Sequence, residues 1–324
     1  MKAVVNTKYG SPDVLQIVEV ARPVPEDNEV LIKVNATTVE TTDTIFRGGK
    51  VFSARLATGI RKPKETTPGS EFAGEVEAVG RAVKQFRVGD RVFGTTAPKM
   101  GAHAEYISVP EDGALALTPD HLSDVEAVAM HPGAMTALPN LQGAAHLQPG
   151  QKILIIGASG SIGSSAVQLA RHFGAEVTGV CSTPNVAMVK SLGADRVIDY
   201  RQEDFTQSGE RYDIVFDTVG KSSFSRARRV LKQGGMYLTT VLSLTILRQM
   251  LWTSKFGRKK ARLVFAGLRP TEEKRGYLAL LLDLDRKGAF KPVVDRTYPL
   301  EQIAEAHRYV ETGRKRGTVV VTLG

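Results

Sequence analysis

The feature that most limits the fold is a glycine-rich turn between an apolar strand-like run and a helix. The run KILII at 152–156 leads into the turn GASGSIG at 157–163, and a helical pattern follows to about residue 173. Against the dinucleotide fingerprint G-x-G-x-x-G, the turn has Ala158, Gly160 and Gly163. Gly160 would let a pyrophosphate approach the backbone, and Gly163 would let the helix pack closely on the strand. The helix amino terminus then offers free N–H groups to phosphates, so we predict nucleotide binding rather than a merely structural glycine turn.

The turn stands inside a longer alternation of apolar runs and helical patterns. Strands are predicted at 152–156, 176–181, 196–198, 213–216 and 236–241, and helices at 124–130, 135–145 and 162–173. Strand and helix repeated in this way are typical of a doubly wound α/β domain with a parallel sheet.

The two ends of the chain have a different pattern. Short Val-rich runs with Gly turns before residue 125 predict a β-rich lobe, and the segment after 268 reads as helix, strand, helix and strand. We therefore predict a β-rich lobe at 1–125, a doubly wound α/β domain at 126–268, and a return to the first lobe at 269–324. The α/β domain would be inserted in the β-rich lobe.

The end of the next strand bears on which dinucleotide is bound. An NAD site usually has Asp or Glu there to hold the ribose 2′-hydroxyl, whereas this chain has Val180, Cys181, Ser182 and Thr183. Glu176 begins that strand and so lies at the wrong end. Without a carboxylate to repel a 2′-phosphate, NADPH is favoured over NADH. The alternative, that Ser182 and Thr183 simply cap the next helix, fits both cofactors.

Cysteine content limits the metal chemistry. Cys181 is the only cysteine among 324 residues, which excludes intramolecular disulfides and metal sites built from several thiolates. We therefore expect no metal and a reducing, cytoplasmic compartment. The amino terminus lacks the apolar core of a signal peptide, and the most apolar window, at 236–252, is too short and too polar to cross a membrane.

The net charge of +9 comes from one segment, 221–262, which has eleven Lys or Arg and no Asp or Glu. Three interpretations stay open. The first is the solvated face of a helix that carries Arg226 to Lys232. The second is a patch at 258–262 for an anionic membrane surface. The third, nucleic-acid binding, lacks any accompanying aromatic or helix-turn-helix pattern.

Motifs along nearly the whole chain resemble the zinc-independent quinone oxidoreductase branch of the medium-chain dehydrogenase/reductase superfamily. The matching stretches follow family order: PGSEFAGEV at 68–76, VGDRV at 88–92, Thr136-Ala137, the glycine turn, LGAD at 192–195, DIVFDTVG at 213–220, LEQIAEAHRYV at 300–310 and GTVV at 317–320. The resemblance implies a GroES-like lobe, a Rossmann domain, NADPH in the cleft between them, and a homodimer.

The resemblance also implies roles for individual residues. The cofactor would contact the turn at Gly157, Ser159, Gly160, Ser161, Ile162 and Gly163, the 2′-phosphate would lie near Ser182 and Tyr200, and the nicotinamide near Thr136, Thr218, Val219 and Val241. Pro184 and Asn185 stand where many members have Lys or Arg, which would soften the preference for NADPH. Glu40 replaces a frequent Asn that faces nicotinamide and substrate, and Trp252 is a further candidate for the substrate pocket.

The expected reaction needs no Lewis acid. Zinc relatives have a Cys near Val39 or Glu40 and a His near Ser70, and this chain has neither. Hydride transfer to a quinone or to an α,β-unsaturated carbonyl fits that absence, and no catalytic residue is assigned. The loops at 46–67 and 242–262 would set the selectivity. The alternative hypothesis is a cofactor-binding regulatory protein, or one that binds nucleic acid or a membrane surface, with little turnover.

Overall fold

The chain divides into two units, and the computed structural model describes residues 1–50, 55, 58–64 and 66–324. Unit 1 contains Met1–Pro132, Leu268–Asp283 and Pro292–Gly324, and unit 2 contains Gly133–Gly267 and Leu284–Lys291. The predicted domain boundaries lie near two of these breaks, but the short stretch Leu284–Lys291 was not foreseen as part of unit 2.

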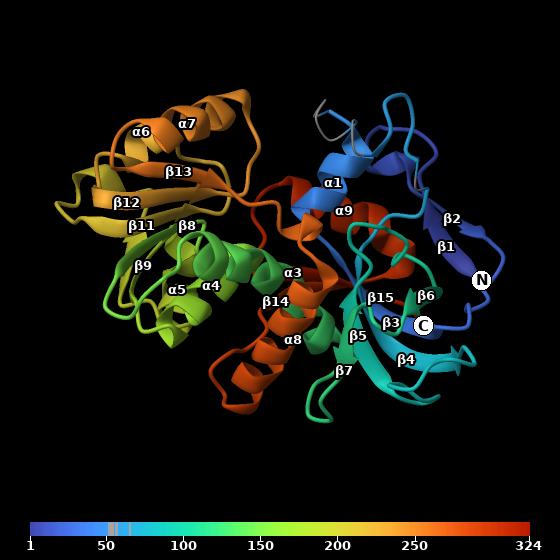
Figure 1. Ribbon diagram of the computed structural model, residues 1–324. Coiled ribbons are helices and arrows are strands. Elements are labelled where there is room, and N and C mark those ends of the chain that lie inside the picture. Colours follow the sequence, from blue (N-terminus) through green and yellow to red (C-terminus); the bar gives the residue numbers. More distant parts are fainter. Residues whose placement is uncertain (51–54, 56–57, 65) are drawn as a thin grey trace. The chain divides into compact units, whose positions relative to one another are not determined.

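Unit 2 is built on a parallel sheet of six strands in the order β10-β9-β8-β11-β12-β13 (Figure 1). Numbered from β8, the order is 3-2-1-4-5-6, that of the dinucleotide-binding folds. The doubly wound α/β fold is thereby confirmed. The strands are β8 (Lys152–Ile156), β9 (Glu176–Cys181), β10 (Arg196–Asp199), β11 (Tyr212–Asp217), β12 (Leu231–Thr239) and β13 (Lys260–Leu263).

Helices cover both faces of this sheet, α4 and α5 on one side and α6 and α7 on the other (Figure 1). Because both faces are covered, the central strands are mostly apolar, and Leu154 and Val215 are fully buried. The helices are α4 (Ser161–His172), α5 (Val186–Ser191), α6 (Phe224–Ala227) and α7 (Leu244–Lys255).

Unit 1 contains a seven-stranded sheet with the path β14-β15-β3-β4-β5-β7, in which β6 also pairs with β3. A separate pair, β1 and β2, is antiparallel. The carboxy-terminal strand β15 pairs with β3 through Val319 and Val39, so the end of the chain does rejoin the first lobe. The strands are β1 (Lys2–Val5), β2 (Gln16–Glu19), β3 (Glu29–Val39), β4 (Glu71–Val79), β5 (Arg91–Thr95), β6 (Tyr106–Pro110), β7 (Ala114–Leu117), β14 (Val294–Pro299) and β15 (Thr318–Thr322).

Four further helices belong to unit 1 or contain residues of both units. They are α1 (Thr41–Gly48), α3 (Asp124–Leu138), α8 (Thr271–Arg286) and α9 (Ile303–Glu311). The prediction of two helices at 124–130 and 135–145 was wrong, because α3 continues through Pro132 and a π-helical turn, Pro139–Ala144, follows. Burial of Ala127, Ala134 and Ala137 outweighs the hydrogen bond that the proline cannot make.

The prediction of one helix from Arg226 to Lys232 was also wrong. Helix α6 has only four residues, and Lys232 lies in strand β12. Its ammonium group pairs with Asp213 at 2.7 Å, and Arg226 pairs with Asp204 at 2.9 Å. Two basic residues in the first part of the segment, Arg226 and Lys232, are therefore paired with acidic residues from outside it.

Candidate functional site

The candidate site lies at the carboxyl edge of the unit 2 sheet, where the strand order reverses between β8 and β11. The glycine turn follows β8, and Thr218 follows β11. The Thr218 hydroxyl donates a 2.8 Å hydrogen bond to the carbonyl of Ile156, the last residue of β8. Ligands of doubly wound sheets bind at such a switch point, so the topology itself points to this edge.

The glycines of the turn have different roles. A Cβ atom on Gly163 would lie 2.1 Å from the Gly157 carbonyl oxygen, so this position admits no side chain where α4 begins. A Cβ atom on Gly160 would meet only that same oxygen, at 3.7 Å, and so would occupy open space above the turn. Gly157 has a φ of +80°, which favours glycine. The close packing expected of Gly163 is present, and the space at Gly160 fits an approaching pyrophosphate.

Asn185 links two of the predicted cofactor residues. Its side-chain nitrogen donates to Ser159 Oγ at 3.0 Å and to Ser182 Oγ at 3.2 Å. Each serine oxygen accepts a hydrogen from the amide, so its own hydroxyl hydrogen remains available to a ligand. Asn185 is 7% exposed, and its Oδ1 has no partner among the described residues. Sequence reasoning missed this contact and treated Asn185 only as the loss of a cation.

Tyr200 lies beside Ser182 because their strands are neighbours in register. Asp199 at the end of β10 pairs with Cys181 at the end of β9, and the Tyr200 N–H donates to the Cys181 carbonyl at 3.1 Å. A hydrogen bond from Thr183 lowers the pKa of the Asp199 carboxyl. Burial, and then Asp199, raise the pKa of the Cys181 thiol to about 11, in keeping with an inert core cysteine.

The second half of the site comes from the ends of β11 and β12. A Cβ atom on Gly157 would lie 2.6 Å from Val219, and one on Gly220 would lie 2.7 Å from Val241. The Thr240 hydroxyl donates to the Thr218 carbonyl at 3.2 Å. Val219 and Val241 remain about half exposed, which leaves an apolar surface next to the glycine turn.

A buried carboxylate, Asp217, holds this loop in place and was not singled out from the sequence. It accepts hydrogen bonds from the N–H groups of Val219, Gly220 and Ser222, and from the hydroxyl of Tyr237. Burial, and then Asp217, raise the pKa of Tyr237, so this hydroxyl stays a donor. An Asp between an apolar strand and a Gly-containing turn was the available signal.

Helix α3 reaches the amino terminus of α4. A Cβ atom on Gly133 would lie 2.2 Å from the Ser161 carbonyl oxygen, so the two helices approach at this glycine. Thr136 follows three residues later on α3, and its carbonyl accepts a 2.8 Å hydrogen bond from Asn140. The structure thus brings the predicted cofactor residues of unit 2 to one edge, while their roles toward the cofactor stay predictions.

Glu40 belongs to unit 1, where it precedes helix α1. Its carboxylate pairs with Lys315 at 2.5 Å, and its backbone N–H donates to Asp43 Oδ2 at 2.7 Å. The side chains of Glu40 and Lys315 are only 14% and 10% exposed. Its expected role toward nicotinamide and substrate stays a prediction, and its pairing with Lys315 could not be read from the sequence.

Two further carboxyl groups lie near Glu40. Thr38 and Ser70 donate to Glu71 at 3.0 Å each, and burial followed by the charge of Glu40 raises the pKa of Glu71 to about 7. Burial, and then Glu71, also raise the pKa of Asp43. Within residues 1–50, 55, 58–64 and 66–324, no three His, Cys, Asp or Glu side chains are arranged to hold a metal ion.

The segments expected to set selectivity are only partly described. Residues 51–54, 56, 57 and 65 of the 46–67 loop lie outside the described residues. The second segment, 242–262, is mostly helix α7 and strand β13 rather than a loop. Trp252 lies on α7 and is 50% exposed, and nothing described places it in a substrate pocket.

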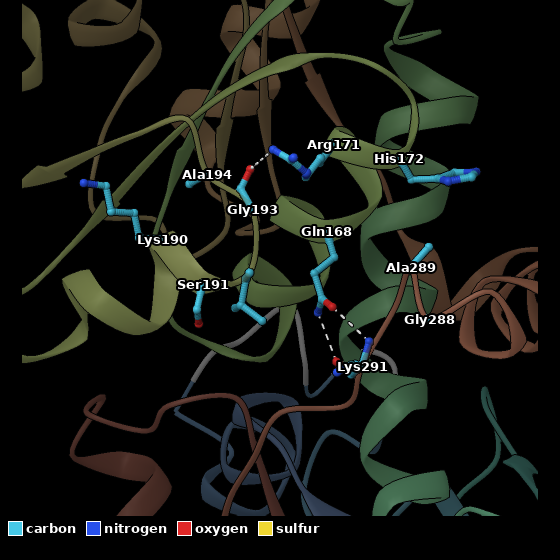
Figure 2. Close-up of a pocket in the computed structure, with 11 residues that line it drawn as sticks. Gln168, Arg171, His172, Lys190, Ser191, Gly193, Ala194, Gly288, Ala289 and Lys291 are labelled. Carbon is cyan, nitrogen blue, oxygen red and sulfur yellow. Dashed lines mark hydrogen bonds between the residues drawn. The ribbon is translucent and has the colours of Figure 1, made fainter.

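A cavity of about 640 Å³ in unit 2 lies away from this site (Figure 2). Arg171 and His172 at the end of α4, and Lys190 at the end of α5, line it together with Lys291. The Arg171 guanidinium donates to the Gly193 carbonyl, which lies just after the end of α5. A positive charge at this place is favourable, because the carboxyl end of a helix carries a partial negative charge. Its lining residues on α4, Gln168, Arg171 and His172, belong to the second half of that helix, and none of its lining residues belongs to the glycine turn, so the cavity is not the predicted dinucleotide site.

Comparison with known proteins agrees with the fold. Residues 26–120 match the alcohol dehydrogenase GroES-like domain, and residues 192–321 match the family described as zinc-binding dehydrogenase. The chain is 36% identical over 333 residues to the 2-methylene-furan-3-one reductase of Solanum lycopersicum, covering 99% of this chain and 79% of that protein.

Two quinone oxidoreductases are also similar over nearly their whole lengths. The Homo sapiens protein is 32% identical over 323 residues, covering 97% of this chain and 94% of the relative. The crystal structure of Escherichia coli quinone oxidoreductase complexed with NADPH superposes with a TM-score of 0.85 at 26% identity, covering 99% of this chain and all of that one. The two family matches and these relatives together show that the chain belongs to the zinc-independent quinone oxidoreductase branch of the medium-chain dehydrogenase/reductase superfamily.

Proposed function

We propose that the protein transfers a hydride from NADPH to a quinone or to the β-carbon of an α,β-unsaturated carbonyl. The main support for the proposal is the set of residues at the carboxyl edge of the unit 2 sheet. These are the glycine turn, Asn185 with its hydrogen bonds to Ser159 and Ser182, and the two loops that contain Thr218 and Val241. NADPH-bound and quinone- or enone-reducing relatives support it. We also propose that no metal takes part, since Ser70 stands where zinc relatives have a histidine.

The residues of unit 2 fit a bound NADPH. Gly160 leaves space for the pyrophosphate, Ser159, Ser161, Ile162 and Gly163 would lie along it at the start of α4, and Ser182 and Tyr200 would offer uncharged donors to the 2′-phosphate. When bound, NADPH supplies the hydride. The apolar surface of Val219 and Val241 would hold the flat nicotinamide ring and exclude water beside it.

The chemistry balances without a metal. The hydride adds to the acceptor, and the resulting hydroquinone anion or enolate takes one proton to give the neutral product. Placing the two reactants side by side can lower the barrier by several kcal/mol, with about 7 to 11 kcal/mol as the upper range for well-oriented reactions. The chain's main contributions would be orientation and exclusion of water.

An acceptor screen tests the proposal. Purified protein is expected to oxidise NADPH in the presence of at least one of a panel of quinones, enals and enones, and to oxidise NADH more slowly. Loss of absorbance at the nicotinamide band measures both. Failure with every acceptor, while NADPH still binds in a fluorescence titration, would overturn the reductase proposal and favour the regulatory alternative.

Assembly and compartment are part of the same proposal. A homodimer could form by pairing two β13 strands, since β13 is the last strand of its sheet. Light scattering tests this. The single buried thiol, Cys181, is compatible with the cytoplasm.

A further inference from the structure

Three carboxyl groups and one ammonium group gather in unit 1 where strand β3 ends. Glu40 follows β3, Glu71 begins β4, and Lys315 lies shortly before β15. Because β3 is antiparallel to both β4 and β15, the starts of these two strands lie beside its end. The third carboxyl group belongs to Asp43 in the first turn of α1. Four elements thereby bring charged side chains to one edge of the unit 1 sheet.

The charges of this cluster do not balance if every group is ionised. Lys315 pairs with Glu40 at 2.5 Å, and Asp43 is buried. Three carboxylates against one ammonium group would leave two negative charges without a counter-ion in the cluster. A carboxyl group in such surroundings keeps its proton rather than carry an uncompensated charge. The ion pair of Glu40 and Lys315 therefore leaves the other two carboxyl groups protonated.

A second observation, which does not depend on counting charges, agrees with retained protons. Glu40 Oε2 accepts the hydrogen bond from Lys315, whereas Glu40 Oε1 is buried and accepts a hydrogen bond from no described residue. A buried acceptor without a donor is unfavourable. A proton on a neighbouring carboxyl group would supply the donor for this oxygen.

Glu71 is the carboxyl group best suited to give its proton away and to regain it. It is partly exposed, whereas Asp43 is buried. The hydroxyl groups of Thr38 and Ser70 lie 3.0 Å from its two oxygens, so they would stabilise the carboxylate after the proton has left. Burial, and then the charge of Glu40, raise the pKa of Glu71 to about 7, which suits a general acid at neutral pH.

A nearby histidine adds no charge to the cluster at neutral pH. His103 Nε2 lies 2.9 Å from the Thr38 carbonyl oxygen, and burial lowers the pKa of this imidazole to about 4. Lys315 also donates to the Gly317 carbonyl at 3.1 Å, which fixes its ammonium group beside Glu40. The proton on Glu71 is therefore controlled mainly by the charge of Glu40.

We propose that Glu71 donates the proton that completes the reduction. This inference rests on the proposed function, in which hydride transfer leaves an enolate or a hydroquinone anion. The O–H bond of Glu71 breaks, the anion forms a new bond to the proton at the enolate α-carbon or the hydroquinone oxygen, and the electron pair stays on the Glu71 carboxylate. Water returns a proton before the next turnover. Glu40, which is expected to face nicotinamide and substrate, is the neighbour that keeps Glu71 protonated.

The pH dependence of turnover tests the proposal. With an acceptor found in the screen, the wild-type kcat is expected to fall as pH rises through about 7, because the donor loses its proton. Glu71→Gln should lower kcat roughly a hundredfold or more, with little change in KM, and should remove this pH dependence. The matched control, Glu75→Gln, removes an exposed carboxyl group from the same strand and should behave as the wild type does. An unchanged kcat in Glu71→Gln would overturn the proposal.

A variant of the neighbouring carboxylate separates proton donation from a structural role. Glu40→Gln removes the charge that raises the pKa of Glu71, so the midpoint of the kcat profile should move to lower pH. Glu40→Asp keeps the charge and should keep a midpoint closer to that of the wild type. A midpoint that does not move in Glu40→Gln would assign the proton to a different donor.

Infrared spectroscopy distinguishes failure of this inference from failure of the proposed function. The C=O stretching band of a protonated carboxyl group should weaken as pH rises through about 7, and Glu71→Gln should lack the part that titrates. If acceptors are reduced but Glu71→Gln has the same band as the wild type, Glu71 holds no proton and this inference alone is wrong. If the band titrates as expected but no acceptor is reduced, the proposed function fails, and the donor role fails with it.

Discussion

The side-chain amide of Asn185 donates a hydrogen bond to Ser159 Oγ at 3.0 Å and thereby fastens the turn after β8 to the loop after β9. The same nitrogen reaches Ser182 Oγ at 3.2 Å. One uncharged residue therefore positions a serine predicted to face the pyrophosphate and another predicted to face the 2′-phosphate. Where many relatives are expected to use a cation, this chain uses a hydrogen-bonded amide.

Asn185→Asp should discriminate between the two dinucleotides. The substitution keeps the side-chain shape but puts a negative charge beside Ser182, which would repel a 2′-phosphate. We expect the Kd for NADPH to rise at least about tenfold, equivalent to about 1.4 kcal/mol, with a much smaller change for NADH. Titrations followed by nicotinamide fluorescence measure both constants.

Asn185→Ala is the companion to that variant. It removes the link between the serines without adding charge, so affinity for both dinucleotides should fall together. Equal losses of NADPH and NADH affinity in Asn185→Asp would contradict a role for this position in cofactor choice.

The two glycines of the turn predict opposite outcomes. Gly163→Ala would place a Cβ atom 2.1 Å from the Gly157 oxygen and 2.7 Å from the Ala158 Cα atom, both of them backbone. We expect a loss of about 1 to 3 kcal/mol in unfolding free energy. Gly160→Ala meets nothing closer than 3.7 Å and has an ordinary φ of −80°, so it should fold normally.

Binding then separates the glycines further. The added methyl at Gly160 would occupy the space left for the pyrophosphate, so that variant should melt like the wild type yet lose NADPH affinity. Thermal unfolding and fluorescence titration of both proteins test this pair. A Gly160→Ala protein that binds NADPH normally would remove the turn from the proposed site.

The hydrogen bonds that Asp217 accepts predict that its substitution lowers the unfolding free energy of unit 2. Asp217→Asn replaces one acceptor oxygen by a donor that faces backbone N–H groups or the Tyr237 hydroxyl. A loss of about 2 to 3 kcal/mol is expected, since several buried donors lose a charged partner. Tyr237→Phe removes a single hydrogen bond and should lose about 1 kcal/mol. Urea unfolding measures both, and similar values for the two variants would show that the N–H contacts of Asp217 contribute little.

Local sequence pattern predicted the framework of unit 2 well. Apolar runs predicted four of the parallel strands to within one residue, whereas β12 begins five residues before the predicted start at 236 and β13 was not predicted. The spacing of Gly160 and Gly163 located the turn. These features depend on residues that are close in the chain, and strand and helix periodicity reports such relationships directly. Burial can outweigh these local signals. At Pro132, a residue type that normally ends a helix, α3 continues because its small side chains are packed in the interior.

The contacts that complete the site were not predictable in the same way. Lys315 meets Glu40 across 275 positions, and Asn185 meets Ser159 across 26. No periodicity encodes which distant side chains will touch. The exposure of Leu244 and Leu251 was equally hidden, because a leucine in an apolar window is ordinarily expected in the core.

Glu71 should make stability depend on pH in a direction opposite to that of most carboxylates. Its pKa is raised to about 7, first by burial and then by the charge of Glu40, against an ordinary value of 4.5. The folded state therefore holds a proton that the unfolded state has already released across this window. The contribution to stability is fully present below pH 4.5 and is lost as pH rises through about 7. Glu71→Gln stays neutral at every pH, so compared with this variant the wild type should lose up to about 3 kcal/mol of unfolding free energy between the two values. Urea unfolding at both ends of the window, with Glu272→Gln as an exposed control, measures the difference. If the gap between wild type and Glu71→Gln does not change with pH, Glu71 is already ionised in the folded protein.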